Sequence, residues 1–119
     1  MKLEHITIRT DRFDDELAFM QDIAGLQVMR EIKDENIHII FLSNREGEPC
    51  IELIDDSEAD FSGNPYLSVG FLTEDAESLR SELIQMDYSV SAMESPSPTV
   101  RFFFVKDPAG VKIQFVQNS

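Results

Sequence analysis

Apolar and polar residues alternate from the start of the chain, which predicts a first β-strand over residues 3–10. From residue 11 onward the apolar positions recur at the spacing of a helix and share one face. They are Phe13, Leu17, Met20 and Ala24. Acidic residues crowd the first turn of this segment, where the helix dipole favours anions, and Gly25 is typical of a helix end. The pattern therefore predicts a helix over residues 14–24.

Three further strands follow this helix, and the whole order then recurs in the second half of the chain. The three strands are expected over residues 26–32, 37–42 and 50–54. The second set is a strand over residues 66–72, a helix over residues 75–86 and strands over residues 88–93, 100–105 and 111–116. Residues 95–98 and 107–110 are expected to be turns within this set. The acidic, turn-rich residues 55–65 are expected to form an exposed linker between the two sets.

The two sets superpose with an offset of 62 or 63 residues, so the chain is predicted to be a repeat. The matching pairs include His5 with Ser68, His38 with Arg101, and Glu52 with Gln114. We expect an α+β fold of two βαβββ repeats, about residues 1–56 and 64–119, in a single domain of residues 1–119. One such unit leaves a sheet face uncovered by its own helix. Two units, within one chain or between chains, are therefore expected to form a curved mixed sheet around a cavity, with the helices on the outer face.

Composition narrows the possible functions. A hydrophobic content of 42% is enough for a folded core. The 23 acidic residues outnumber the 10 basic ones, and the net charge of −13 repels phosphate backbones, so we expect no nucleic-acid partner. The charge serves either solubility or the attraction of a cationic ligand. We expect a cytoplasmic protein with no membrane partner, because the sequence has no long apolar run, no signal peptide and only one cysteine, Cys50.

Several short motifs carry a family resemblance. They are Leu3-Glu4-His5-Ile6, Ile51-Glu52-Leu53-Ile54, Phe71-Leu72-Thr73-Glu74-Asp75, Phe104-Val105-Lys106-Asp107-Pro108-Ala109-Gly110 and Ile113-Gln114-Phe115. In this order and at the repeat spacing, the sequence resembles the vicinal oxygen chelate superfamily of glyoxalases, bleomycin resistance proteins and extradiol dioxygenases. The resemblance covers essentially the whole chain. It implies a small organic molecule as ligand and a homodimer as the assembly.

The resemblance also implies four positions for metal ligands, because the first strand of each unit supplies a His and the last strand a Glu in metal-bearing members. By position these are His5, Glu52, Ser68 and Gln114, and a slip of one residue would put Leu67 in the place of Ser68. A serine hydroxyl and a glutamine carbonyl are poor ligands for zinc, nickel or iron. We therefore expect no bound metal and no other cofactor, with a divalent metal on His5 and Glu52 as the alternative.

Strand alternation predicts which side chains line the cavity. The predicted ligand-binding residues are His5, Arg9, Glu52, Ser68, Arg101, Phe103 and Gln114. Phe103 is expected to stack on a ligand, while its neighbours Phe102 and Phe104 are expected to pack against the helices. His38 either faces the cavity, as its match to Arg101 indicates, or lies exposed on an edge strand.

Each charged candidate also has a purely structural explanation. His5 is either part of a ligand site or a histidine hydrogen-bonded at the start of a strand. Glu52 lies between two apolar residues and needs a partner, which is His5, Arg101 or a metal. The resemblance implies that Arg9 binds a substrate carboxylate, and the alternative is a surface ion pair. Arg101 either anchors an anionic ligand or neutralises Glu52.

The leading hypothesis is a small-molecule binding protein of this superfamily with a degenerate metal site. The alternative is an enzyme of the same superfamily, a metal-dependent lyase, isomerase or dioxygenase. A metal-free acid–base reaction that uses His5 and Glu52 is a variant of that alternative. A third hypothesis is a regulatory or interaction domain without a small ligand. The sequence contains no phosphate loop, CxxC motif or Ser-His-Asp triad.

Overall fold

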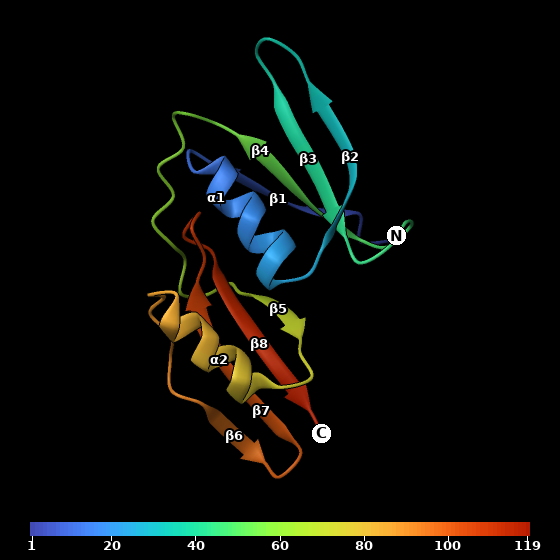
Figure 1. Ribbon diagram of the computed structural model, residues 1–119. Coiled ribbons are helices and arrows are strands. Elements are labelled where there is room, and N and C mark those ends of the chain that lie inside the picture. The colour runs from blue at the N-terminus through green and yellow to red at the C-terminus, as the bar shows by residue number, and fades with distance from the viewer. The chain divides into compact units, whose positions relative to one another are not determined.

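In each half of the chain, one helical segment packs on a four-stranded sheet (Figure 1). The computed structural model describes residues 1–119, which divide into two units, Met1–Phe61 and Ser62–Ser119. The elements of unit 1 are β1 (His5–Thr10), α1 (Phe13–Ala18), the π-helical turn η1 (Phe19–Ile23), β2 (Gln27–Lys33), β3 (His38–Ser43) and β4 (Cys50–Asp55). Those of unit 2 are β5 (Val69–Leu72), α2 (Ala76–Gln85), β6 (Glu94–Ser97), β7 (Val100–Lys106) and β8 (Lys112–Asn118).

The two sheets have the same topology. Their strand orders are β1-β4-β3-β2 and β5-β8-β7-β6. The first strand of each unit runs parallel to the last, and the other neighbours are antiparallel. The prediction of an α+β fold made of two βαβββ units is confirmed. No helix is long and apolar enough to cross a membrane.

The first helical segment begins and ends close to the predicted bounds, but its buried face differs. The last five residues form a π-helical turn, and Phe19 and Met20 are buried there. Leu17, predicted to belong to the buried face, is only half-buried, while Glu16 is fully buried. Phe13 and Met20, which were predicted on the same face, are buried, and Ala24 is half-buried. The helical spacing therefore predicted part of the buried face and missed Glu16 and Phe19.

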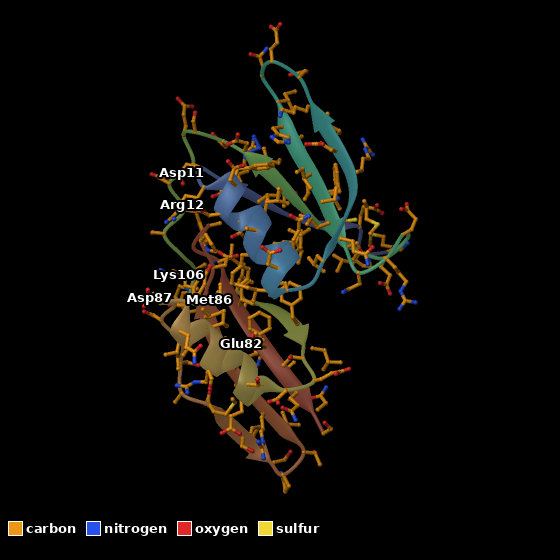
Figure 2. The ribbon with its side chains drawn as sticks, viewed as in Figure 1. Asp11, Arg12, Glu82, Met86, Asp87 and Lys106 are labelled. Atoms are coloured by element: carbon orange, nitrogen blue, oxygen red, sulfur yellow. The ribbon has the colours of Figure 1, made fainter.

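The second helix has well-defined ends. Asp75 caps its start, because the Asp75 side chain accepts a hydrogen bond of 3.0 Å from the backbone N–H of Ser78. At the other end Asp87 adopts a φ of 67°, in the left-handed region that commonly ends helices (Figure 2). The predicted helix over residues 75–86 is confirmed. Its buried side chains are Ala76 and Leu83, which pack towards β7 and β8.

Each unit has its core between the helix and the sheet. In unit 1 the buried sheet residues are Ile8, Ile40, Leu42, Ile51 and Leu53. In unit 2 they are Phe103, Val105, Ile113 and Phe115. Strand register places each of these sets on one face of its sheet. The opposite face of each sheet is not covered by the unit's own helix, so it is the face on which a ligand could contact the sheet.

The strand predicted over residues 88–93 is displaced along the chain. Strand β6 is formed by Glu94–Ser97, where a turn was expected, and in the predicted stretch only Val90 forms an isolated bridge, to Val105. The order of the sheet explains this result, because β6 is an edge strand. Pro96 removes a backbone donor, and an edge strand tolerates that loss. The run of serines and prolines therefore forms an edge strand up to Ser97, and of the predicted turn only Pro98 lies in the observed turn, together with Thr99.

Candidate functional site

The uncovered sheet face of unit 1 carries most of the polar candidates. His5 and Thr7 of β1 lie beside Cys50 and Glu52 of β4, because His5 is in register with Cys50 and Thr7 with Glu52. The antiparallel register of β3 and β4 puts Phe41 directly opposite Glu52. Adjacent strands thus bring an imidazole, a hydroxyl, a carboxylate and an aromatic ring to one patch of the sheet.

Glu52 is the best-connected polar side chain of this patch. Thr7 Oγ1 donates a hydrogen bond of 2.5 Å to Glu52 Oε1, and His5 Nε2 lies 3.4 Å from the same oxygen. The Glu52 side chain is only 16% exposed, against 39% for His5. A half-buried carboxylate needs a partner, and Glu52 has two, His5 and Thr7. His5 was one of the partners that the sequence analysis left open, whereas Thr7 was not. Both contacts fall on one oxygen, so Oε2 remains available to a ligand.

Phe41 anchors the same patch and was missed by the sequence reasoning. The His5 ring meets the Phe41 ring edge-on, with 6.3 Å between centroids and an interplanar angle of 77°. On β2, the guanidinium carbon of Arg30 lies 5.2 Å from the Phe41 centroid. Such a cation–aromatic contact orients both groups on the surface. The signal available in the sequence was the repeat, because Phe41 falls 63 residues before Phe104.

Arg9 lies further along β1 and has an acidic neighbour. Its Nε atom lies 3.5 Å from Asp56 Oδ2, and the Arg9 side chain is 59% exposed. This ion pair is the structural explanation that the sequence left open for Arg9. It occupies part of the guanidinium but leaves most of its surface accessible.

The corresponding positions in unit 2 follow the same register. Gly70 of β5 is paired with Gln114 of β8, just as Thr7 is paired with Glu52. Ser68 precedes β5 and lies two residues before Gly70. In the same way, His5 lies two residues before Thr7 in unit 1. Backbone pairing therefore makes Ser68 the counterpart of His5 and Gln114 the counterpart of Glu52. Leu67, the alternative for a one-residue slip, does not satisfy this relation.

Two predicted site residues lie on the wrong face. The register of β7 and β8 pairs Phe104 with Gln114, so Phe103 and Arg101 are on the opposite side. Phe103 is fully buried, with its ring centroid 5.7 Å from that of Phe115. Arg101 Nη1 lies 3.6 Å from Glu77 Oε2 of α2. The predictions that Phe103 stacks on a ligand and that Arg101 lines the same face as Gln114 are wrong.

The aromatic residues expected against the helix take the exposed role instead. Phe102 and Phe104 lie on the uncovered face, edge to face, with ring centroids 5.7 Å apart. Lys112 Nζ lies 4.3 Å from the Phe104 centroid. Unit 2 therefore repeats the arrangement of an aromatic ring with a cation above it that Phe41 and Arg30 form in unit 1.

His38 also lies on the helix-covered face and not with His5. Its Nε2 atom is 2.6 Å from Glu31 Oε2, and its ring centroid is 4.5 Å from that of Phe13 in α1. The idea that His38 faces the cavity is therefore wrong, and its partners explain its place at the end of β3.

The side chains do not form a transition-metal site. In neither unit do three or more His, Cys, Asp or Glu side chains form a group that could hold a metal ion. His5 and Glu52 provide two donors, whereas such sites usually take at least three from the protein. Their counterparts, Ser68 and Gln114, carry neutral oxygens that bind zinc, nickel or iron poorly. The donor set of this chain does not fit the metal that the family resemblance implies.

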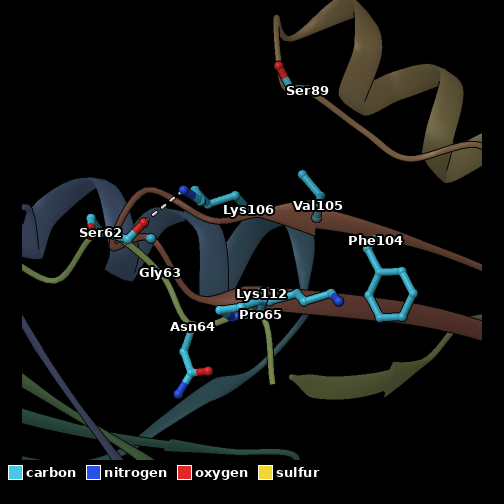
Figure 3. A pocket seen from close by; sticks show the side chains of 10 residues that line it. Ser62, Gly63, Asn64, Pro65, Ser89, Phe104, Val105, Lys106 and Lys112 are labelled. Carbon is cyan, nitrogen blue, oxygen red and sulfur yellow. Dashed lines mark hydrogen bonds between the residues drawn. The ribbon is translucent and has the colours of Figure 1, made fainter. Parts of the chain in front are cut away.

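Two small cavities border the aromatic residues of the uncovered faces. In unit 1 a cavity of about 290 Å³ lies beside Phe41, Arg30 and Cys50. In unit 2 a cavity of about 330 Å³ lies beside Phe104 and Lys112 (Figure 3). Both volumes are near the lower end of the range for small-molecule sites. Each unit therefore combines an aromatic ring, a cation and a hollow on one side of its sheet.

Comparison with known proteins assigns this architecture. The family model described as the Glyoxalase/Bleomycin resistance protein/Dioxygenase superfamily matches residues 2–115. The chain belongs to this superfamily. The resemblance inferred from the sequence motifs is thereby confirmed.

The chain is similar in sequence to a lyase and in fold to two solved structures. The lactoylglutathione lyase of Haemophilus influenzae is 24% identical over 128 residues, which cover 99% of this chain and 93% of that protein. A glyoxalase family protein from Bacillus cereus has a TM-score of 0.83 at 18% identity, over 99% of this chain and 94% of the other. An antibiotic binding protein from Streptomyces sp. CB03234 has a TM-score of 0.74 at 14% identity, over 100% and 97% of the two chains. At such identities the two solved structures show a shared fold.

Proposed function

We propose that this protein is a small-molecule binding protein with a degenerate metal site. One observation carries the proposal: only one of the two units keeps the His and Glu of the family pattern. His5 and Glu52 contact each other in unit 1, while Ser68 and Gln114 take the equivalent positions in unit 2. Two neutral side chains cannot replace an imidazole and a carboxylate as ligands of a tightly held metal. A scaffold that has lost such ligands keeps its cavity and its capacity to bind organic molecules.

The uncovered sheet face of each unit is a proposed binding surface. The polar members are His5, Arg9 and Glu52 in unit 1, and Ser68 and Gln114 in unit 2. Phe41 and Phe104 supply the aromatic contacts, in place of the buried Phe103. Glu52 Oε2 can accept a hydrogen bond from a ligand, since its other oxygen already has two partners. A few convergent polar groups in a largely apolar wall are the usual form of a small-molecule site.

The kinship with a binding protein supports this proposal. A solved structure with the same fold is described as an antibiotic binding protein, so the fold serves binding without being tied to one reaction.

We further propose that the chain forms a homodimer in the cytoplasm. A specific interface buries about 1,000 Å² or more in total, and such an interface should hold the dimer together at micromolar concentration. Sedimentation that finds only a monomer at that concentration would contradict the dimer.

A metal-dependent lyase, isomerase or dioxygenase is the second candidate. The kinship with a lactoylglutathione lyase over 99% of the chain favours it. The contact between His5 and Glu52 supplies half of the ligand set that such an enzyme needs. In that reaction the metal would polarise adjacent oxygens of the substrate.

Metal analysis combined with ligand screening separates the two candidates. The protein is purified after growth with added zinc, nickel and iron, and its metal content is measured by mass spectrometry. We expect no stoichiometric metal, together with thermal stabilisation by small organic compounds that is reduced in Glu52→Gln. About one ion per chain, lost in His5→Ala and accompanied by lactoylglutathione lyase activity, would overturn the proposal.

A further inference from the structure

The cavity of unit 2 differs from the rest of this acidic protein in its charge. Lys106 and Lys112 line it, and no Asp or Glu does. These are two of the four lysines in a chain with a net charge of −13. The cavity of unit 1 has the opposite balance, because its two cations, Lys2 and Arg30, are accompanied by three glutamates. The cavity of unit 2 is thus a local positive site on a negative molecule.

Both lysines are held in place but keep free donors. Lys106 Nζ donates a hydrogen bond of 2.9 Å to the backbone carbonyl oxygen of Ser62, as the dashed line in Figure 3 marks. Lys112 Nζ lies 4.3 Å from the centroid of the Phe104 ring. An ammonium group has three N–H donors, and neither contact uses more than one of them. Each lysine can therefore donate to an anion without giving up the contact that positions it.

The linker between the units builds one wall of this cavity. At Gly63 the backbone has a φ of 121°, which L-residues with a side chain rarely adopt. A Cβ atom there would lie 3.3 Å from the carbonyl oxygen of Gly110 and from the Cε and Nζ atoms of Lys106. Glycine therefore allows the linker to approach the turn between β7 and β8 closely. The result is a shallow hollow that is open to solvent on one side.

We propose that the cavity of unit 2 binds a small aromatic carboxylate. The carboxylate pairs with the ammonium groups that line the cavity, those of Lys106 and Lys112, and the apolar body packs on Pro65 and on the part of Phe104 that Lys112 leaves uncovered. Asn64 and Ser89 line the same hollow and supply neutral hydrogen-bonding groups. The volume of about 330 Å³ suits a molecule of this size. A single anionic group matches the two lysines, whereas the apolar walls favour an organic body over an inorganic ion.

This inference rests on the proposed binding function, because it names the class of ligand. Lys106 and Lys112 thereby take the place of Arg101 as the proposed source of anion selectivity, because Arg101 pairs with Glu77. Local charge decides the selectivity, since the field of the distant acidic surface is screened over about 8 Å at physiological salt. The protein is therefore expected to prefer an anion in spite of its overall charge.

Titration of the full chain with benzoate, followed by backbone amide NMR, tests the inference. We expect saturable shifts centred on Gly63 and Gly110, which border the cavity. Lys106→Ala and Lys112→Ala should each weaken benzoate about tenfold, the usual effect of losing one charge-assisted hydrogen bond. Lys33→Ala is the matched control, because it removes the same charge from an exposed position at the end of β2. It should leave the affinity unchanged.

Benzylamine serves as the probe of opposite charge. We expect no shifts around the cavity with this cation. Three results would overturn the inference: no saturable benzoate binding, benzoate binding that neither lysine variant weakens, or benzylamine binding at least as tightly at the same amides. Each leaves the proposed binding function standing if screening finds another ligand. Stoichiometric metal with lyase activity would instead remove the proposed function, whatever benzoate does.

Discussion

His5 Nε2 lies 3.4 Å from Glu52 Oε1, the same oxygen that accepts the hydroxyl hydrogen bond of Thr7. This contact joins the first and last strands of unit 1, which run parallel and side by side. Unit 2 has the same backbone pairing, with Ser68 and Gln114 at the equivalent positions. One scaffold thus presents an ionisable pair in one unit and a neutral pair in the other. The difference between the two units at these positions is confined to two side chains and does not involve the backbone pairing.

Restoring the family pattern in unit 2 should therefore create metal affinity. We expect the double variant Ser68→His/Gln114→Glu to bind nickel at least about tenfold more tightly than the unmodified chain, since it supplies the two missing ligand types. Isothermal titration with NiCl₂ measures the change. The single variant Ser68→His is the control and should gain less. A double variant without any gain would show that these positions are not equivalent to His5 and Glu52.

Phe103 and Phe102 should differ sharply in their contribution to stability. Phe103 is fully buried against Phe115, whereas Phe102 is half-buried on the uncovered face. We expect Phe103→Ala to lower the free energy of unfolding by about 3–5 kcal/mol, because it leaves a cavity in the core. Phe102→Ala should cost about 1 kcal/mol. Urea denaturation of both variants checks this order, and the reverse order would contradict the register of β7.

Arg101 should matter little to either stability or binding. Its ion pair with Glu77 spans 3.6 Å, and the two side chains are 48% and 78% exposed. Solvent screens such a pair, so Arg101→Ala should change the free energy of unfolding by less than about 1 kcal/mol. Benzoate affinity should be unchanged, because Arg101 lies on the helix-covered face. A marked loss of benzoate binding in this variant, measured by the same NMR titration, would place Arg101 in the site after all.

The repeat made the fold predictable from the sequence. Two helices and seven of the eight strands were predicted at or near their observed positions, because the spacing of apolar residues changes clearly between strand and helix. The pairing of Glu52 with Gln114 also followed from the repeat and agrees with the strand register. What the spacing could not reveal was the π-helical turn at Phe19–Ile23, since an extra residue in a turn leaves no mark on the composition.

The face of β7 could not be read from alternation, and this explains the misplaced site residues. The run Phe102-Phe103-Phe104 is apolar on both faces of the strand. Alternation therefore does not show which of these side chains faces the core and which faces away from it. The repeat held the missing information. Phe104 matches Phe41, and each ring lies opposite the residue at the Glu52 or Gln114 position. Cross-strand pairing, and not the pattern within one strand, decides which aromatic side chain can meet a ligand.

Gly63 should be needed both for stability and for the cavity of unit 2. Its φ of 121° strains any residue with a side chain, and a Cβ atom would lie only 3.3 Å from the carbonyl oxygen of Gly110. We expect Gly63→Ala to lower the free energy of unfolding by about 2–3 kcal/mol, from backbone strain and the contact with a backbone oxygen. Gly47→Ala is the matched control, because Gly47 also has a positive φ, of 86°, but its Cβ would meet nothing within 4 Å. It should cost only about 1 kcal/mol.

Ligand binding gives the decisive measurement for Gly63. In Gly63→Ala the linker relieves the contact with the Gly110 carbonyl oxygen by moving away from it, and it then also moves away from Lys106, whose ammonium group is hydrogen-bonded to the carbonyl oxygen of Ser62. That movement opens the wall of the cavity and frees the lysine, so benzoate affinity should fall several-fold while Gly47→Ala retains it. Titrations are compared well below the unfolding temperature of each variant, so that loss of folded protein does not contribute. Equal benzoate affinity in Gly63→Ala and the unmodified chain would show that the linker does not form a wall of the binding site.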